Sequence, residues 1–134
     1  MIVSDERVAR FVSQRLGASF CPPYVTMGIE RDGEIVAGVL FNQFEGPNVH
    51  VTVAGSGWSL PFLRAVGVYV FDQLGCLRMT LTTEQDAVVR YALRLGGEVE
   101  GRMRDYYGEG RDGVIVGVLR KDWKFGRLPA SKRG

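Results

Sequence analysis

The spacing of apolar residues near the start of the chain is that of an amphipathic helix. Between residues 5 and 16, apolar side chains recur three or four positions apart, so that they share one face of a helix. Ser4 or Asp5 can cap the first turn, and Gly17 can end the last one. We therefore expect the chain to begin with a helix.

A hairpin and a third strand follow this helix. Residues 26–31 and 34–42 flank Asp32-Gly33, which is a strong hairpin signal when it lies between two apolar runs. After a polar loop at residues 43–47, residues 48–54 alternate strictly, with valines on one side of the predicted strand. The other side is polar and available for function; it carries Asn48, His50 and Thr52.

The second half of the chain combines one long apolar segment with several shorter patterns. Residues 59–74 are apolar nearly all round and precede Gly75, which favours a helix packed deeply against a sheet. Because the chain has no internal repeat or linker, we expect one domain over residues 1–125. The remaining expected elements are a strand at 77–83, a helix at 84–95 and antiparallel strands at 98–107 and 113–120.

Composition describes an ordinary water-soluble domain. The chain has 134 residues, of which 46% are hydrophobic and 24% charged, enough to bury a core without metals or disulfides. Arg64 and Asp72 interrupt the longest apolar run, so we expect no membrane segment and a cytoplasmic location. Cys21 and Cys76 lack metal-type spacing, which predicts a reduced pair of small core residues and no metal site.

Positive charge gathers at the C-terminal end, although the formal net charge of the whole chain is only +2. Residues 126–134 are expected to form a basic tail after the domain. Between residues 120 and 134, only Asp122 opposes the basic residues Arg120, Lys121, Lys124, Arg127, Lys132 and Arg133. Such a segment either binds a phosphate backbone or is a solvated end that keeps the protein soluble.

The most informative local feature is a strand that ends on glycines and turns directly into a helix. Gly55 and Gly57 lack a Cβ atom that would keep a ligand from the backbone, and Ser56 or Ser59 can cap the helix that follows. Pro61 fits the first turn of that helix, whose unpaired N–H groups favour an anion. The junction predicts a phosphate-binding turn, with plain turn chemistry as the alternative.

The order of these elements, together with the glycine turn, resembles the GNAT family of acyl-CoA-dependent N-acetyltransferases over nearly the whole chain. Residues 71–76, 95–101 and 116–120 also resemble segments of small GNAT-type proteins of phages and prophages. The resemblance implies an α/β (α+β) fold with a central, mixed, mostly antiparallel twisted sheet and helices on both faces. It places the protein in the host cytoplasm if a phage encodes it.

The resemblance further implies that acetyl-CoA is the co-substrate and binds where two neighbouring strands splay apart. The strand edge implied for the pantetheine arm consists of Val51, Thr52, Val53 and Ala54. The turn implied for the pyrophosphate consists of Gly55, Ser56, Gly57 and Trp58. This turn lacks the basic residue that usually leads the family's phosphate loop. Trp58 either covers the coenzyme or fills the core.

For the reaction, the resemblance implies transfer of an acetyl group to a primary amine, which needs a base and a proton donor. His50 is the only histidine and lies on the polar strand face, so we expect it to be the base, unless it makes only a structural hydrogen bond. Glu45 is the alternative base. Many family members carry a proton-donating tyrosine where this chain has Ala92. Tyr91, about 100° round the helix, and an ordered water are the candidate donors.

Two tyrosines near the end of the penultimate strand are candidates for binding the acceptor. Arg104 and Tyr106 share one strand face by alternation and are the expected acceptor-binding pair. Asp105 and Tyr107 share the other face. Since the faces are opposite, only one of these pairs is expected to line the cleft.

Asn42 and Asn48 flank the polar loop and either hold the acceptor or make hydrogen bonds within turns. The partners that remain open are an unidentified amine, nucleic acid through the basic tail, and a second copy of the chain. The alternative function is that of a catalytically divergent or non-catalytic GNAT-fold phage protein. Such a protein would act on or bind nucleic acid or an assembly partner.

Overall fold

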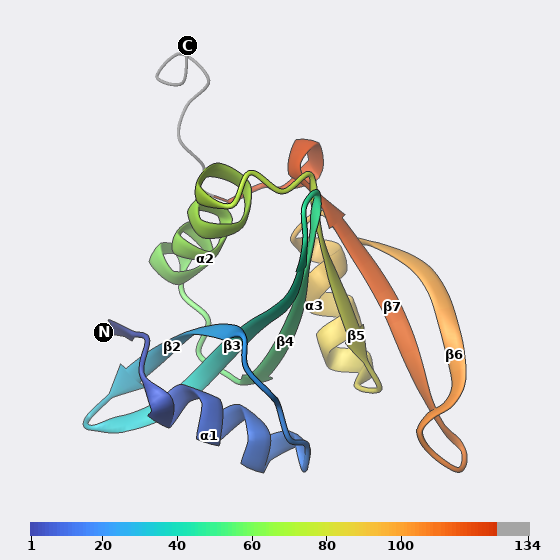
Figure 1. The fold of residues 1–134 in the computed structure, drawn as a ribbon, viewed down its shortest axis with the longest axis horizontal. Coiled ribbons are helices and arrows are strands. Elements are labelled where there is room, and N and C mark those ends of the chain that lie inside the picture. Colours follow the sequence, from blue (N-terminus) through green and yellow to red (C-terminus); the bar gives the residue numbers. More distant parts are fainter. Residues whose placement is uncertain (126–134) are drawn as a thin grey trace.

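A computed structural model describes residues 1–125, which form a seven-stranded sheet and the helices packed on it (Figure 1). The basic tail expected at residues 126–134 lies outside the described residues. Along the sheet the strands follow the order β1-β2-β3-β4-β5-β7-β6. Their bounds are Ile2–Val3 (β1), Tyr24–Arg31 (β2), Glu34–Glu45 (β3), Asn48–Gly55 (β4), Arg78–Thr83 (β5), Glu98–Gly108 (β6) and Arg111–Leu119 (β7). The helices are α1 (Glu6–Leu16), α2 (Leu60–Gly67) and α3 (Asp86–Arg94), with shorter helical segments η1 (Val68–Gln73) and η2 (Arg120–Asp122).

Neighbouring strands are antiparallel, except that β4 and β5 are parallel. The expected mixed, mostly antiparallel sheet is therefore confirmed. The parallel pairing is short and runs from Asn48 opposite Arg78 to Val51 opposite Leu81. Beyond these residues β4 stays paired with β3, and β5 with β7. Figure 1 shows β4 and β5 diverging as a V; we call this divergence the splay.

Alternation along the strands gives each face of the sheet its own core. Phe41 of β3 is buried against α2 and η1, whereas its neighbour Leu40 faces the opposite way and packs with Val12 of α1. On the α2 face, Ala92 of α3 packs against Val116 of β7. Helices therefore cover both faces, with α1 on one and α2, η1 and α3 on the other.

Local side-chain chemistry accounts for several element boundaries. Asp5, rather than Ser4, is the N-cap of α1 and accepts a hydrogen bond (2.9 Å) from a backbone N–H of the first turn. Ser59, rather than Ser56, caps α2 in the same way (3.3 Å). The β2–β3 turn has a positive φ at both residues of Asp32-Gly33, which matches a type I′ hairpin.

Two segments differ from the expectation based on hydrophobic pattern. Most of the expected loop at residues 43–47 is strand, because β3 continues to Glu45 and pairs with Asn48 across an irregular register. Backbone pairing of this kind needs no apolar side chain. The single helix expected at residues 59–74 is instead α2 followed by the π-helical segment η1.

Smaller corrections concern short or exposed segments. Strand β1 pairs with β2 over only two residues, too few to show a period in the sequence. The β6–β7 hairpin turns at Glu109-Gly110, so both strands are longer than expected. Cys76 is buried, as expected, but Cys21 is exposed and therefore is not a core residue. Within residues 1–125 no helix has the length and apolar character needed to span a membrane.

Candidate functional site

Separation of β4 and β5 leaves a cavity on each face of the sheet. The apolar cavity, about 480 Å³, lies on the face covered by α2 and α3. Its walls include Phe62 of α2, Val88 of α3 and Leu81 of β5, and the described lining contains no Asp or Glu. The residues expected to bind the coenzyme that line this cavity are Val51, Val53, Ala54, Gly55 and Trp58.

The polar cavity, about 380 Å³, lies on the opposite face. His50 and Thr52 of β4 line it together with Thr80 and Thr82 of β5. They alternate with Val51 and Val53 in β4 and with Met79 and Leu81 in β5, which line the apolar cavity. Asn42, which pairs with His50 in the β3–β4 ladder, also lines the polar cavity.

The two cavities meet at the splay. Residues that line both are Leu16, Val51, Val53, Leu81 and Gln85. Because β4 and β5 are not paired with each other beyond Val51 and Leu81, a narrow ligand can lie along the free edge of β4 and reach both faces. An extended chain with amide groups can pair with such an edge as an added strand would.

The glycine turn after β4 has a backbone that favours glycine and an arginine beside it. Gly55 and Gly57 have φ values of 96° and 86°, and a Cβ on Gly55 would overlap the backbone of Val36 in β3. Close approach to β3 therefore explains Gly55 without any ligand. At the end of β2, Arg31 donates from Nη2 to the carbonyl oxygen of Gly57 (3.1 Å). No local pattern indicates Arg31, because it precedes Gly57 by 26 residues and meets it only through the sheet.

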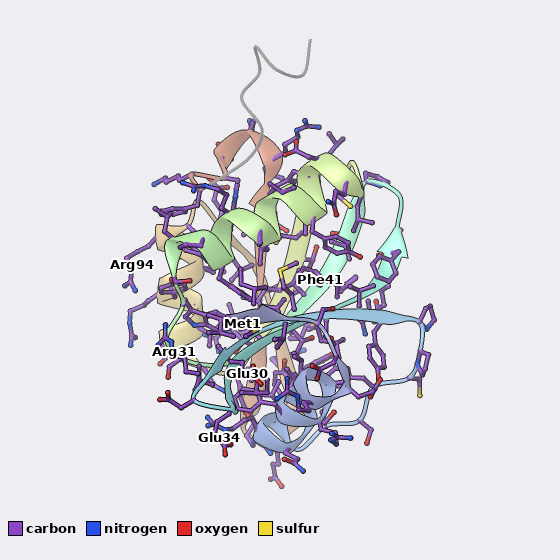
Figure 2. The ribbon with its side chains drawn as sticks, turned by 90° about the vertical axis from the view of Figure 1, so that its left-hand side faces the viewer. Met1, Glu30, Arg31, Glu34, Phe41 and Arg94 are labelled. Atoms are coloured by element: carbon purple, nitrogen blue, oxygen red, sulfur yellow. The ribbon has the colours of Figure 1, made fainter. Side chains whose placement is uncertain are left out.

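Arginines border the apolar cavity. Arg15 of α1 and Arg94 of α3 are part of its lining, and Figure 2 shows Arg31 and Arg94 on the same side of the molecule. The guanidinium of Arg94 lies 5.2 Å from the ring centroid of Tyr91, which also lines this cavity. An apolar cavity bordered by guanidinium groups suits a ligand with an extended neutral arm and an anionic end.

His50 interacts with the alternative base predicted from the sequence. Its Nε2 lies 3.2 Å from Oε1 of Glu45, and the same oxygen accepts a hydrogen bond from Nδ2 of Asn48 (3.1 Å). Only His50 among these three residues belongs to the described lining of the polar cavity. The structure therefore brings together the expected base His50, the alternative base Glu45 and the expected acceptor residue Asn48. Of these three, His50 is the one that lines the polar cavity.

Both tyrosines of β6 line the polar cavity, which corrects the expectation that strand alternation admits only one of them. The β6–β7 register shifts between Met103 and Gly108, and Asp105 has a φ of 56°, so regular alternation fails in this segment. Tyr106 and Tyr107 consequently lie edge to face, with ring centroids 4.9 Å apart. Arg104, the expected companion of Tyr106, is not part of the described lining.

Tyr107 is held at the splay by its hydroxyl group. The hydroxyl donates to the carbonyl oxygen of Thr82 (2.9 Å), one residue beyond the last β5 residue that pairs with β4. Burial is the main cause of a raised pKa of Tyr107, and the nearby Tyr106 and Glu84 raise it further. At neutral pH Tyr107 is therefore a neutral phenol, and its single hydrogen is the one directed at Thr82.

An ion pair forms one wall of the polar cavity. Arg111 donates from Nε (2.9 Å) and Nη2 (2.6 Å) to the two carboxylate oxygens of Glu84. This contact with Arg111 lowers the pKa of Glu84 and raises that of Arg111. Glu84 is the only carboxylate in the described lining of the polar cavity, and its charge is already balanced.

No family model and no curated protein matches the chain, but solved structures do. Over 90% of its length the protein aligns with the spermidine/spermine N-acetyltransferase SpeG from Vibrio cholerae, solved in complex with manganese ions. The alignment covers 92% of the SpeG chain, with a TM-score of 0.69 and 11% sequence identity. A probable acetyltransferase aligns over 75% of this chain and 63% of its own, with a TM-score of 0.63 and 18% identity. The protein has the GNAT fold. Identities this low establish the fold alone.

Two polar side chains reach the site from distant strands. The glycine turn lacks its own leading basic residue, but Arg31 contacts that turn from β2. Ala92 lines the apolar cavity beside Tyr91, while Tyr107 reaches the splay from β6. Arg31 and Tyr107 carry no motif, because only strand pairing brings them to these places.

Proposed function

We propose that the protein transfers an acetyl group from acetyl-CoA to a primary amine. The observation that carries this proposal is the meeting of an apolar and a polar cavity at the splay. At this junction the thioester of acetyl-CoA would have the rest of the coenzyme on one face of the sheet and the amine on the other. Holding the thioester and the amine together in this way favours acyl transfer between them.

The residues of the apolar side fit acetyl-CoA. The free edge of β4 beyond Val51 offers backbone groups to the pantetheine amides, and Val53 and Leu81 offer apolar contact. The turn from Gly55 to Trp58 and the guanidinium of Arg31 would hold the pyrophosphate at the start of α2.

The polar side supplies the acid–base chemistry. We propose that His50 accepts a proton from the amine, directly or through a water, so that the amine nitrogen attacks the thioester carbonyl carbon. The new C–N bond forms as the C–S bond breaks, and the coenzyme leaves as a thiol. Its sulfur receives a proton from Tyr107, from Tyr91 or from a water, and the hydroxyl of Tyr107 is the one held at the splay.

Charge in the polar cavity favours an acceptor with a single amine. SpeG is a spermidine/spermine N-acetyltransferase, and each of those amines carries several positive charges. Here the lining offers one carboxylate, that of Glu84, already paired with Arg111. Additional cations would lie without counter-charges. We therefore propose a monoamine, held near His50 by the hydroxyl and amide groups of the lining, including those of Asn42 and Tyr106.

Calorimetric titration with acetyl-CoA tests the proposal directly. We expect binding, and we expect Arg31→Gln to weaken it by about tenfold through loss of a charge-assisted phosphate contact. Arg10→Gln is the matched control, because Arg10 is exposed on α1 and lines neither cavity. A thiol-release assay with a panel of amines should then give higher kcat/KM for monoamines than for spermidine. Absence of binding at millimolar acetyl-CoA would contradict the proposal and favour a non-catalytic GNAT-fold protein that binds nucleic acid or an assembly partner.

A further inference from the structure

A chain of hydrogen bonds crosses from β5 to β3 and ends at His50. Nε of Arg78 donates to Oγ1 of Thr80 (3.3 Å), and that hydroxyl donates to Oδ1 of Asn48 (2.7 Å). Nδ2 of Asn48 donates to Oε1 of Glu45 (3.1 Å), which lies 3.2 Å from Nε2 of His50. We call Arg78, Thr80, Asn48 and Glu45 the relay.

The two ends of the relay, Arg78 and Glu45, determine which group donates in each of its hydrogen bonds. A guanidinium can only donate, so the hydroxyl oxygen of Thr80 accepts from Arg78 and uses its single hydrogen on Asn48. This orients the amide of Asn48 with its NH2 group toward Glu45. An ionised carboxylate can only accept, so the hydrogen between Glu45 and His50 belongs to Nε2 of His50.

The donor end of the relay is anchored across β7. Arg78 also donates from Nη1 to Oε2 of Glu100 in β6 (3.2 Å). Strand β7 lies between β5 and β6, and Gly117 lies where this ion pair passes over it. A Cβ at Gly117 would overlap both Arg78 and Glu100. The missing side chain therefore makes room for the pair that holds Arg78 in place.

We propose that the relay is a positioning device that keeps the proton of neutral His50 on Nε2 and leaves Nδ1 as the basic nitrogen. This inference rests on the proposed function, in which His50 is the base. It assigns positioning roles to Glu45 and Asn48, because neither belongs to the described lining of the polar cavity, whereas His50 does. The same contacts restrict rotation of the imidazole, so that Nδ1 keeps one orientation toward the amine.

Nitrogen-15 NMR of the histidine ring tests the relay without any assay of activity. The chain contains a single histidine, so the ring signals need no assignment by mutation. At a pH where the ring is neutral, we expect the Nε2-protonated form to predominate beyond its share in free histidine. Glu45→Ala should return the two ring nitrogens toward the shifts of free histidine. Glu34→Gln is the control, because Glu34 is exposed at the start of β3.

A double-mutant cycle separates positioning from general structural damage. We expect Glu45→Ala to lower kcat on the order of tenfold with little change in KM, because a loosely held base is misplaced in most encounters. Asn48→Leu should lower kcat less, and should have almost no further effect in the Glu45→Ala background, since Asn48 acts through Glu45. Glu45→Gln retains an acceptor oxygen and should keep part of the activity that Glu45→Ala loses.

The outcomes distinguish failure of the relay from failure of the proposed function. A ring protonated mainly on Nδ1, or the same ring spectrum in the wild type and Glu45→Ala, would overturn the relay even if the protein is an acetyltransferase. Additive effects of Glu45→Ala and Asn48→Leu would also overturn it. The expected ring spectrum in a protein that transfers no acetyl group would support the relay and refute the proposed function.

Discussion

The apolar and polar cavities are built by the same two strands but differ in chemistry. Met79 of β5 lines only the apolar cavity, while its neighbour Thr80, and His50 on β4, line only the polar one. The difference arises because successive side chains of a strand point to opposite faces of the sheet. Where two such strands separate, both chemistries become accessible from one point. A splayed parallel pair can therefore serve a reaction between a long, largely apolar donor and a polar acceptor.

The largest effect is expected when the polar side loses its base. His50→Gln should lower turnover by about 10²-fold or more, while the affinity for acetyl-CoA and the Tm stay close to those of the wild type. Single-turnover kinetics, calorimetry and thermal unfolding measure the three quantities. Unchanged turnover would show that His50 is not the base, so that the polar cavity would not owe its chemistry to this residue.

A change confined to the apolar side should affect affinity rather than chemistry. Gly57→Asp places a carboxylate at the turn implied for the pyrophosphate and should weaken acetyl-CoA binding by more than tenfold. Since Gly57 has a φ of 86° and an added Cβ would lie 2.9 Å from Nη1 of Arg31, any side chain strains this backbone and displaces Arg31, and Gly57→Ala provides the control for both effects. Calorimetry on both folded variants measures the difference. Equal affinities of the two variants would remove the turn from the coenzyme site.

The two candidate proton donors line different cavities: Tyr107 the polar one and Tyr91 the apolar one. Tyr107→Phe removes the hydroxyl held at the splay and should lower turnover by roughly tenfold, whereas Tyr91→Phe should change it by less than about threefold. Each substitution keeps the aromatic ring, so packing is preserved. The reverse order of effects would assign the proton transfer to the apolar side, and no effect of either variant would favour a water.

The smallest effect concerns the ion pair in the wall of the polar cavity. The contact with Arg111 lowers the pKa of Glu84 from its ordinary value of 4.5. A lowered carboxyl pKa contributes stability that is complete above pH 4.5 and is lost as the pH falls through the lower value of the folded protein. Glu84→Gln should therefore lower the Tm by roughly one or two degrees at pH 7. The difference should shrink below pH 4; a constant difference from pH 7 to pH 3 would contradict this account.

Much of the fold follows from short-range patterns in the sequence. The type I′ turn at Asp32-Gly33, the cap at Ser59 and the alternation through His50 all act within a few residues, and the structure contains each of them. The order of the longer helices and strands, from α1 to β7, follows from the same patterns, whereas β1 and η1 do not. Local periodicity also separates the polar face of β4 from its apolar face before any pairing is known.

Only the tertiary structure decided which distant residues meet at the site. Arg31 reaches the glycine turn through the β2–β3–β4 pairing, and an irregular β6–β7 register turns both Tyr106 and Tyr107 toward the polar cavity. The parallel pairing of β4 with β5 ends at Val51, and this end creates the splay. Register and bulges depend on contacts between segments far apart in the chain, whereas the period of a strand depends only on its own residues. For this reason the sequence indicates His50, Glu45, Asn48, the two tyrosines and the glycine turn one by one, but not Arg31, Arg78, Thr80 or the contacts that bring these residues together.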